Sequence, residues 1–281
     1  MTKIGFLHPG AMGISLATSA QNSGHEACWI SDGRSTETRQ RAEEHHLSDL
    51  QTLPLLTRTC SAIVSICPPH AAEDVAKSVA AQNFDGLYVD ANAISPQRAI
   101  RIQEIVEKAG AHFVDGSVIG GPAWKPNNTW LQLSGDYAQD IATLFSKGPL
   151  ETNIIGKEIG KASALKMAYA AYSKGTTALL AAILATAENF DVRNELEAQW
   201  AKYEPEFVEE AHARTKRVTA KAWRFAGEMD EIAETFAEAG LPSGFHEAAG
   251  EIYHRIADFK GATETPELEK VLTELLNIER L

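Results

Sequence analysis

Residues 160–189 read GKASALKMAYAAYSKGTTALLAAILATAEN, and the rest of the chain is organised around this stretch. It contains no proline and is rich in Ala and Leu, which lose little rotamer freedom in a helix. We therefore expect one helix, roughly 45 Å long at about 1.5 Å per residue. The part after Lys174 is apolar almost all round, so it should be buried on every side. Before it, three- and four-residue spacing predicts a polar stripe on one face, formed by Lys166, Tyr169, Ser173 and Thr177.

The composition of the 281-residue chain is that of a soluble globular protein with one large domain or two ordinary ones. Its net charge of −12 disfavours nucleic acid and anionic membranes as partners. No apolar run is long enough to span a bilayer, and no signal peptide is expected at the N-terminus. Cysteines 28, 60 and 67 are odd in number and lie in apolar contexts, so we expect a reducing, cytoplasmic location without disulfides. Cys and His show no zinc-ligand spacing, so no metal is expected.

Short β-rich runs alternate with helical segments in the first half of the chain. Strands are expected at 3–7, 26–30, 62–66, 86–90, 112–118, 129–133 and 152–155. Helices are expected at 11–23, up to about 47, and at 70–81, 96–109 and 137–146. This alternation is typical of an α/β Rossmann-type fold with a doubly wound parallel sheet.

The pattern changes to helices alone after Gly160, which places a domain boundary near 158–160. Besides the long stretch, helices are expected near 193–202, 205–225, 227–239, 243–259 and 266–278. The sequence therefore predicts two domains, over 1–158 and over 159–281, the second of them all-α.

A glycine-containing turn, GFLHPGAMG over residues 5–13, joins the first strand to the first helix. Dinucleotide folds use glycine there because the backbone approaches a pyrophosphate at the helix N-terminus. His8 stands at the first glycine position of G-x-G-x-x-G, while Gly10 and Gly13 keep the second and third. An ordinary turn would explain the motif alone, but its place in the first βαβ unit favours a cofactor site. The expected contacts are His8, Pro9, Gly10, Ala11, Met12 and Gly13.

The end of the second expected strand favours NADP over NAD. Ser31 stands where an acid would hold the ribose diol, and Arg34 and Ser35 could cradle a 2′-phosphate. Asp32 lies one residue late and keeps NAD open, and a solvated loop would also explain these residues. Cys67, Pro68 and Asn92 follow two other strands, at the sheet edge where ligands bind in such folds. We expect Cys67 and Pro68 to line the cofactor pocket and Asn92 to bind the nicotinamide amide or the substrate.

A further glycine pair, Gly120-Gly121, follows the strand that contains Asp115. Such a pair lets a ligand anion approach backbone amides, although a chain reversal would serve equally well as an explanation.

Together these motifs resemble the β-hydroxyacid dehydrogenase superfamily, which includes 3-hydroxyisobutyrate and 6-phosphogluconate dehydrogenases and, more distantly, imine reductases. The resemblance covers nearly the whole chain and is closest to a 6-phosphogluconate-dehydrogenase-like branch with its own C-terminal domain type. The family's G-F-[IV]-G-x-G-x-M-G signature falls on residues 5–13, with His8 as the departure. Its S-T-x-x-P segment falls on 92–96, where both Ser and Thr are replaced, and its K-D-L segment falls on 227–229 without the Lys.

The site residues of the family map onto three further positions. Ile119 stands where a Ser contacts the substrate carboxylate, Lys166 matches the catalytic Lys, and Tyr169 replaces a polar Asn or His. A snorkelling surface lysine is the alternative reading of Lys166.

The resemblance implies an NAD(P)-binding first domain and a second domain for substrate binding and homodimerisation. It implies an oxidoreductase that moves hydride between nicotinamide and a secondary alcohol or carbonyl of a small hydroxyacid-like substrate. Lys166 would exchange the hydroxyl proton, and Tyr169 would share it. The implied substrate contacts are Asn92, Ile119, Gly120, Gly121, Lys166 and Ser173. Two alternatives stay open: reduction of C=N bonds, and a non-catalytic dinucleotide sensor, which the lost Ser and Thr residues motivate.

Overall fold

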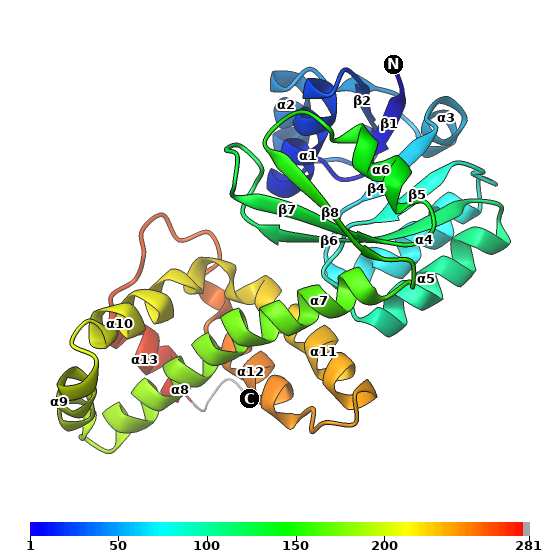
Figure 1. Ribbon diagram of the computed structural model, residues 1–281. Coiled ribbons are helices and arrows are strands. Elements are labelled where there is room, and N and C mark those ends of the chain that lie inside the picture. The colour runs from blue at the N-terminus through cyan, green and yellow to red at the C-terminus, as the bar shows by residue number, and fades with distance from the viewer. Residues whose placement is uncertain (278–281) are drawn as a thin grey trace. The chain divides into compact units, whose positions relative to one another are not determined.

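The computed structural model of the chain describes residues 1–277 and divides it into two compact units. The first unit comprises Met1–Met167, and the second begins at Ala168 (Figure 1). The sequence predicts the division at 158–160, before the long helical stretch, whereas the units divide inside that stretch. The two units are therefore described one at a time.

The first unit is built on one eight-stranded sheet with the order β3-β2-β1-β4-β5-β6-β7-β8. The strands are β1 (Lys3–Phe6), β2 (Glu26–Trp29), β3 (Ser48–Asp49), β4 (Ala62–Ser65), β5 (Leu87–Asp90), β6 (His112–Gly120), β7 (Thr129–Ser134) and β8 (Leu150–Gly156). The first six are parallel, in the 3-2-1-4-5-6 order of the doubly wound fold. β7 is antiparallel to β6, so the doubly wound sheet that the sequence predicts as parallel is mostly parallel. Residues 121–128 are too few for the helical crossover that a parallel strand requires.

Helices cover both faces of this sheet (Figure 1). One face packs α1 (Ala11–Asn22), α2 (Thr36–Glu44) and α6 (Ala138–Leu144), and the other packs α3 (Leu53–Thr59), α4 (Ala72–Ala80) and α5 (Pro96–Lys108). Side chains alternate along the strands: Val64 and Val89 face the first layer, while Ile63 and Tyr88 face the second. The sequence prediction missed β3 and α3. β3 consists of two polar residues, which are too few to show a periodic pattern. α3 is a short helix that begins beside Pro54, so its apolar pattern is also short.

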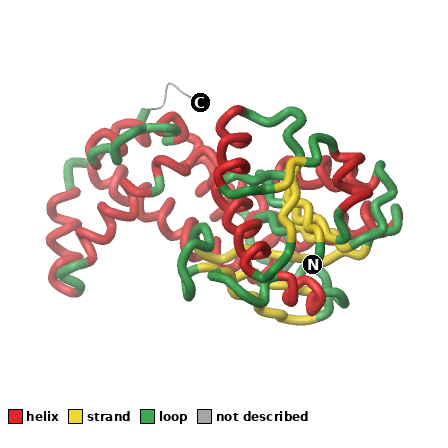
Figure 2. The backbone as a smooth tube through the Cα atoms, turned by 90° about the horizontal axis from the view of Figure 1, so that it is seen from above, coloured by secondary structure: helices red, strands yellow, loops and turns green. Residues whose placement is uncertain are grey.

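The second unit contains helices and loops and, within the described residues, no strand (Figure 2). The helix α7 (Lys161–Ala170) leads into it and continues through a π-helical turn (Ala171–Gly175) into α8 (Thr176–Asn189). The others are α9 (Arg193–Tyr203), α10 (Phe207–Arg217), α11 (Ala222–Glu238), α12 (Gly244–Arg255) and α13 (Leu268–Leu276). The expected break near 226 is wrong because α11 runs through it and the chain turns at 218–221 instead. The expected helix over 266–278 extends one residue beyond the described part.

The π-helical turn changes the faces of the long helical stretch. Tyr169 is 50% exposed and Thr177 only 3%, so the residues of the expected polar stripe do not share one environment. A π-helical turn takes one residue more than an α-helical turn and therefore rotates the side chains that come after it. The expectation of burial on every side after Lys174 is also wrong within this chain, since Leu179 is 59% and Ile183 36% exposed. None of the helices in residues 1–277 is long and apolar enough to cross a membrane.

Candidate dinucleotide and catalytic site

The turn between β1 and α1 leaves room for a ligand at the helix N-terminus. A Cβ at Gly13 would lie 2.3 Å from the His8 carbonyl oxygen, so only glycine lets α1 pack against the turn. A Cβ at Gly10, the N-cap residue, would meet nothing within 4 Å. No side chain caps the amides at the start of α1. Open space above Gly10 and uncapped amides are what a pyrophosphate requires at this position.

Three of the predicted cofactor residues, from three different loops, come together beside this turn. The Arg34 guanidinium acts electrostatically on both His8 and Cys67. Burial and Arg34 lower the pKa of His8 to about 4, so its imidazole is neutral. Burial and Asp90 raise the pKa of Cys67 to about 12, which keeps the thiol protonated.

The buried polar atoms in this cluster are not all satisfied. The atoms His8 Nδ1 and Arg34 Nε are buried, and no hydrogen-bond partner for either lies within residues 1–277. Burial lowers the pKa of Arg34, and the nearby Cys67 and Asp32 partly oppose this decrease. A half-buried guanidinium whose Nε is an unused donor fits an anionic ligand group such as a ribose phosphate.

The remaining residues after β2 have structural roles. Ser35 is the N-cap of α2, where its hydroxyl accepts the Thr38 amide at 3.3 Å. The Asp49 carboxylate accepts the Ser31 amide at 3.2 Å, and an Arg39 amino group donates to the Ser31 carbonyl. The predicted phosphate cradle therefore reduces to Arg34. Sequence reasoning missed Arg41, whose Nη1 donates to the Pro9 carbonyl at 3.4 Å and links α2 to the glycine turn.

Asn92 holds the ends of two neighbouring strands together. Its side chain is buried, and its Oδ1 accepts the Cys67 amide at 2.5 Å. Its Nδ2 donates to Asp90 Oδ2 at 2.8 Å and to Ser65 Oγ at 3.3 Å. These bonds occupy the amide, so the expected contact with nicotinamide or substrate is corrected to a positioning role for the Cys67-Pro68 turn.

A buried carboxylate fixes the start of α7. Asp115 lies at 0% exposure on β6. Its Oδ2 accepts the backbone amides of Gly160, Ala162 and Ser163 at 2.9–3.2 Å and the Ser134 hydroxyl at 3.0 Å. Its Oδ1 accepts the Ser163 hydroxyl at 2.7 Å. Burial raises the pKa of Asp115, and these hydrogen bonds oppose the shift. One residue therefore joins β6, β7 and the helix that carries Lys166.

Lys166 points back to the same strand. Its Nζ donates to the Val118 carbonyl at 2.8 Å, three residues beyond Asp115 on β6. Asp115 and Lys166 thus attach α7 to β6 at two points, one at the helix N-terminus and one a turn and a half later. Lys166 is half-buried and its ammonium group is bound to the sheet, which is evidence against a snorkelling surface lysine.

The glycine pair after β6 serves the reversal into β7. Gly120 has φ +114°, and a Cβ there would lie 2.1 Å from the Asn128 carbonyl oxygen. The Gly121 carbonyl accepts the Thr129 hydroxyl at 2.7 Å, and Ile119 pairs with Trp130 in the sheet. The reversal accounts for these residues without a ligand.

Tyr169 and Ser173 belong to the second unit. The Ser173 hydroxyl donates to the Tyr169 carbonyl at 3.1 Å, so this serine bonds to its own helix.

Comparison with known proteins identifies two domains in the chain. Residues 3–141 match the NAD binding domain of 6-phosphogluconate dehydrogenase, and residues 187–256 match a domain of unknown function (DUF1932). An uncharacterised 28.5 kDa protein of Methanothermus fervidus is 28% identical over 195 residues, which are 69% of this chain and 74% of that protein.

Two solved structures are similar over almost the whole chain. The conserved protein MTH1747, of unknown function and described as similar to 3-hydroxyacid dehydrogenases, is 27% identical with a TM-score of 0.69. The match covers 91% of this chain and 97% of that one. The 3-hydroxyisobutyrate dehydrogenase of Mycobacterium tuberculosis is 16% identical with a TM-score of 0.72, over 98% and 99% of the two chains, and shows the shared fold.

The fold and the turn define a protein that binds a nicotinamide dinucleotide through a Rossmann-type domain and has a helical C-terminal region. Residues 3–141 therefore carry a domain similar to the NAD-binding domain of 6-phosphogluconate dehydrogenase, and residues 187–256 carry the DUF1932 domain. The structural neighbours of the chain are 3-hydroxyisobutyrate dehydrogenase-like proteins, as the sequence motifs predicted.

Proposed function

We propose that this chain is an NAD(P)-dependent oxidoreductase that transfers hydride between the nicotinamide ring and a secondary alcohol, or its carbonyl form, of a small hydroxyacid-like substrate. The observation that carries the proposal is the attachment of Lys166 to β6, 2.8 Å from the Val118 carbonyl, on a helix whose start Asp115 fixes. When bound, the cofactor supplies the hydride chemistry. The protein orients the reactants and moves the hydroxyl proton, which is the role of Lys166, with Tyr169 one helical turn later as a partner.

The residues that would hold the cofactor are those of the glycine turn, His8 to Gly13, together with Arg34, Cys67 and Pro68. The uncapped amides of α1 suit the pyrophosphate, and the unused donor of Arg34 suits a 2′-phosphate. We therefore propose NADP as the preferred cofactor, with NAD as the alternative.

The second unit is proposed to form a homodimer. Leu179, Ile183 and Phe190 are spaced at four and seven residues along and just beyond α8, and all are exposed in the single chain. An apolar stripe of this kind is typical of a helix that packs against a second copy. The cysteines, all free, suit the reducing cytoplasm that we propose as the location.

The experiment that tests the catalytic proposal compares Lys166→Ala with Lys161→Ala. Lys161 lies on the same helix, is exposed and pairs with Glu158, so it is a matched control. Both variants should bind NADPH as the wild type does. Lys166→Ala should lower the turnover of a panel of hydroxyacids and their keto forms by about 100-fold or more, and Lys161→Ala should not.

Three other outcomes would change the proposal. Unchanged turnover in Lys166→Ala would remove this lysine from the reaction. Activity on cyclic imines with none on hydroxyacids would favour C=N reduction. Tight NADPH binding without turnover of either panel would favour a sensor.

The cofactor preference is tested by fluorescence titration with NADPH and NADH. Arg34→Ala should lose the preference for NADPH, whereas Arg58→Ala, on the exposed side of α3, should keep it. Equal affinity of the wild type for the two cofactors would refute the role of Arg34.

A further inference from the structure

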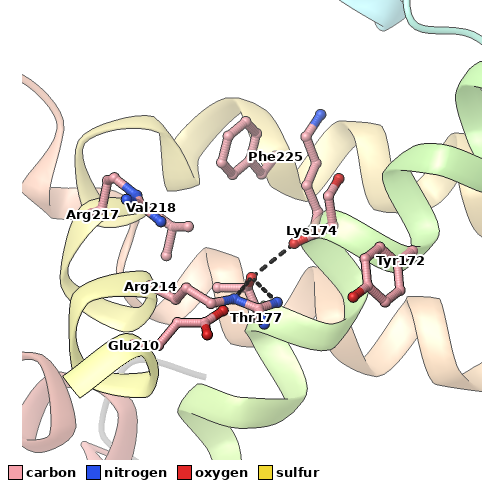
Figure 3. Close-up of a pocket in the computed structure, with 9 residues that line it drawn as sticks. Tyr172, Lys174, Thr177, Glu210, Arg214, Arg217, Val218 and Phe225 are labelled. Atoms are coloured by element: carbon pink, nitrogen blue, oxygen red, sulfur yellow. Dashed lines mark hydrogen bonds and ion pairs between the residues drawn. The ribbon is translucent and has the colours of Figure 1, made fainter. Parts of the chain in front are cut away.

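The helical unit contains a cavity of about 430 Å³ that the proposed function does not use. It is open to solvent: the π-helical turn and the start of α8 line one side, α10 lines another, and Phe225 of α11 lines a third (Figure 3). This volume lies in the range of small-molecule sites. All of its lining residues lie within the second unit.

Arg214 is held in one orientation at this cavity. Its Nε and Nη2 donate to Thr177 Oγ1 at 3.2 and 2.9 Å (Figure 3). Its Nη2 also donates to Thr176 Oγ1 at 2.6 Å. Its Nη1 comes no closer than 3.8 Å to Glu210 Oε1, which is longer than a hydrogen bond. The fixed guanidinium therefore keeps two donors for a ligand oxygen.

A second arginine lines the same cavity one helical turn later. Arg217 is exposed and forms no ion pair with any residue in the described part of the chain. Two guanidinium groups three residues apart on α10 can bind one planar anion.

Lys174 enters the cavity from the π-helical turn and is already paired. Its ammonium forms a buried ion pair with Glu228 and lies 4.6 Å from the centre of the Phe225 ring. The Tyr253 hydroxyl donates to the Lys174 carbonyl at 2.8 Å, which holds the turn in place. π-Helical turns occur frequently at functional sites, and this one presents three consecutive residues, from Tyr172 to Lys174, to the cavity.

The charges of the site favour an anion. Lys174 is paired with Glu228, which lies outside the lining, and the two guanidinium groups of Arg214 and Arg217 stand against the single carboxylate of Glu210. Lys221 and Arg224 add positive charge near Lys174. The ring of Phe225, the side chain of Val218 and the ring of Tyr172 supply apolar surface around the guanidinium groups (Figure 3).

We propose that this cavity binds a small organic acid, with its single carboxylate on Arg214 and Arg217 and its apolar body against Phe225, Val218 and Tyr172. The proposal does not rest on the oxidoreductase activity, because its test uses neither cofactor nor turnover.

The test is calorimetric titration of the whole chain with 3-phenylpropionate, its neutral amide, and benzylphosphonate as a dianionic probe. The carboxylate should bind with a Kd below about 1 mM, and the amide should bind about tenfold more weakly or not at all. Arg214→Met and Arg217→Met should each weaken binding of the carboxylate about tenfold. Lys202→Met, an exposed charge change on α9, should not affect it.

Arg217→Met keeps the test decisive, because an exposed, unpaired arginine can be replaced without disturbing the fold. No carboxylate binding up to about 10 mM, or binding that both arginine variants leave unchanged, would overturn the proposal. Tighter binding of the phosphonate than of the carboxylate would overturn the assignment of a single carboxylate.

Discussion

Truncation of the Asp115 side chain should be among the most destabilising substitutions in the first unit. In Asp115→Ala the backbone amides of Gly160 and Ser163 lose their carboxylate acceptor, while the Ala162 amide keeps Ser134 Oγ at 3.2 Å. The Ser163 and Ser134 hydroxyls lose their acceptor as well. Each of these four buried donors costs about 1–3 kcal/mol when it is left without an acceptor, so we expect a loss of at least about 4 kcal/mol in the free energy of unfolding.

Asp115→Asn separates the charge from the shape of this side chain. The amide oxygen can still accept at the Oδ2 position, and the Ser163 hydroxyl can accept from the amide nitrogen. Hydrogen bonds to a neutral oxygen are weaker than those to a carboxylate, so the loss should be about 2 kcal/mol. Glu158→Gln is the control, because Glu158 is an exposed acid that lies before the same helix, and its removal should leave the unfolding midpoint unchanged.

Urea unfolding, followed by circular dichroism and tryptophan fluorescence, measures all three variants. A loss below about 1 kcal/mol in Asp115→Ala would refute the reasoning, since buried donors would then have found other acceptors. An Asn variant as stable as the wild type would mean that the carboxyl group is protonated in the fold, the direction in which burial moves its pKa.

The other predictions concern the glycine turn and the proposed dimer. Gly10→Ala should fold normally, because the added Cβ contacts no other atom, but it should weaken NADPH binding about tenfold in a fluorescence titration. Gly13→Ala should instead lower the unfolding midpoint, because the added Cβ clashes with the His8 carbonyl. The pKa of His8 falls from 6.5 in the unfolded chain to about 4, so the unfolded chain takes up the proton first and stability should fall as the pH drops from 6.5 to 4. His8→Gln should remove about 3 kcal/mol of that loss in pH-dependent urea titrations, and an unchanged slope would contradict it. Leu179→Asp should convert a dimer into a stable monomer by light scattering, and a wild type that is itself monomeric would refute the dimer.

The alternation of strands and helices could be predicted because it depends on local apolar runs and turn residues. Short polar elements such as Ser48–Asp49 carry no such signal. The direction of Thr129–Ser134 could have been inferred from the short connection before it, since no crossover helix fits into residues 121–128. The apolar run that predicts this strand does not by itself indicate the direction of the strand.

The site residues also differ in whether a local sequence pattern or the fold determines their place. Gly10, Gly13 and Arg34 were predicted because a motif fixes their places around a turn. Asn92 was misjudged because a polar residue at a strand end can face a ligand or a neighbouring strand, and only the fold decides which. The anchoring role of Asp115 depends on Gly160, 45 residues later, and no local pattern reports so distant a contact.

The π-helical turn at Ala171–Gly175 has a consequence for how this chain is compared with others. A helix that contains one such turn holds one residue more than a regular helix with the same ends. Relatives without the turn would therefore align with a one-residue gap here, and position-by-position transfer of residue roles beyond Gly175 would point to the wrong side of α8. Deleting a single residue from the turn should rotate the side chains of α8 by about 100° relative to those of α7. A different set of α8 side chains would then face the neighbouring helices.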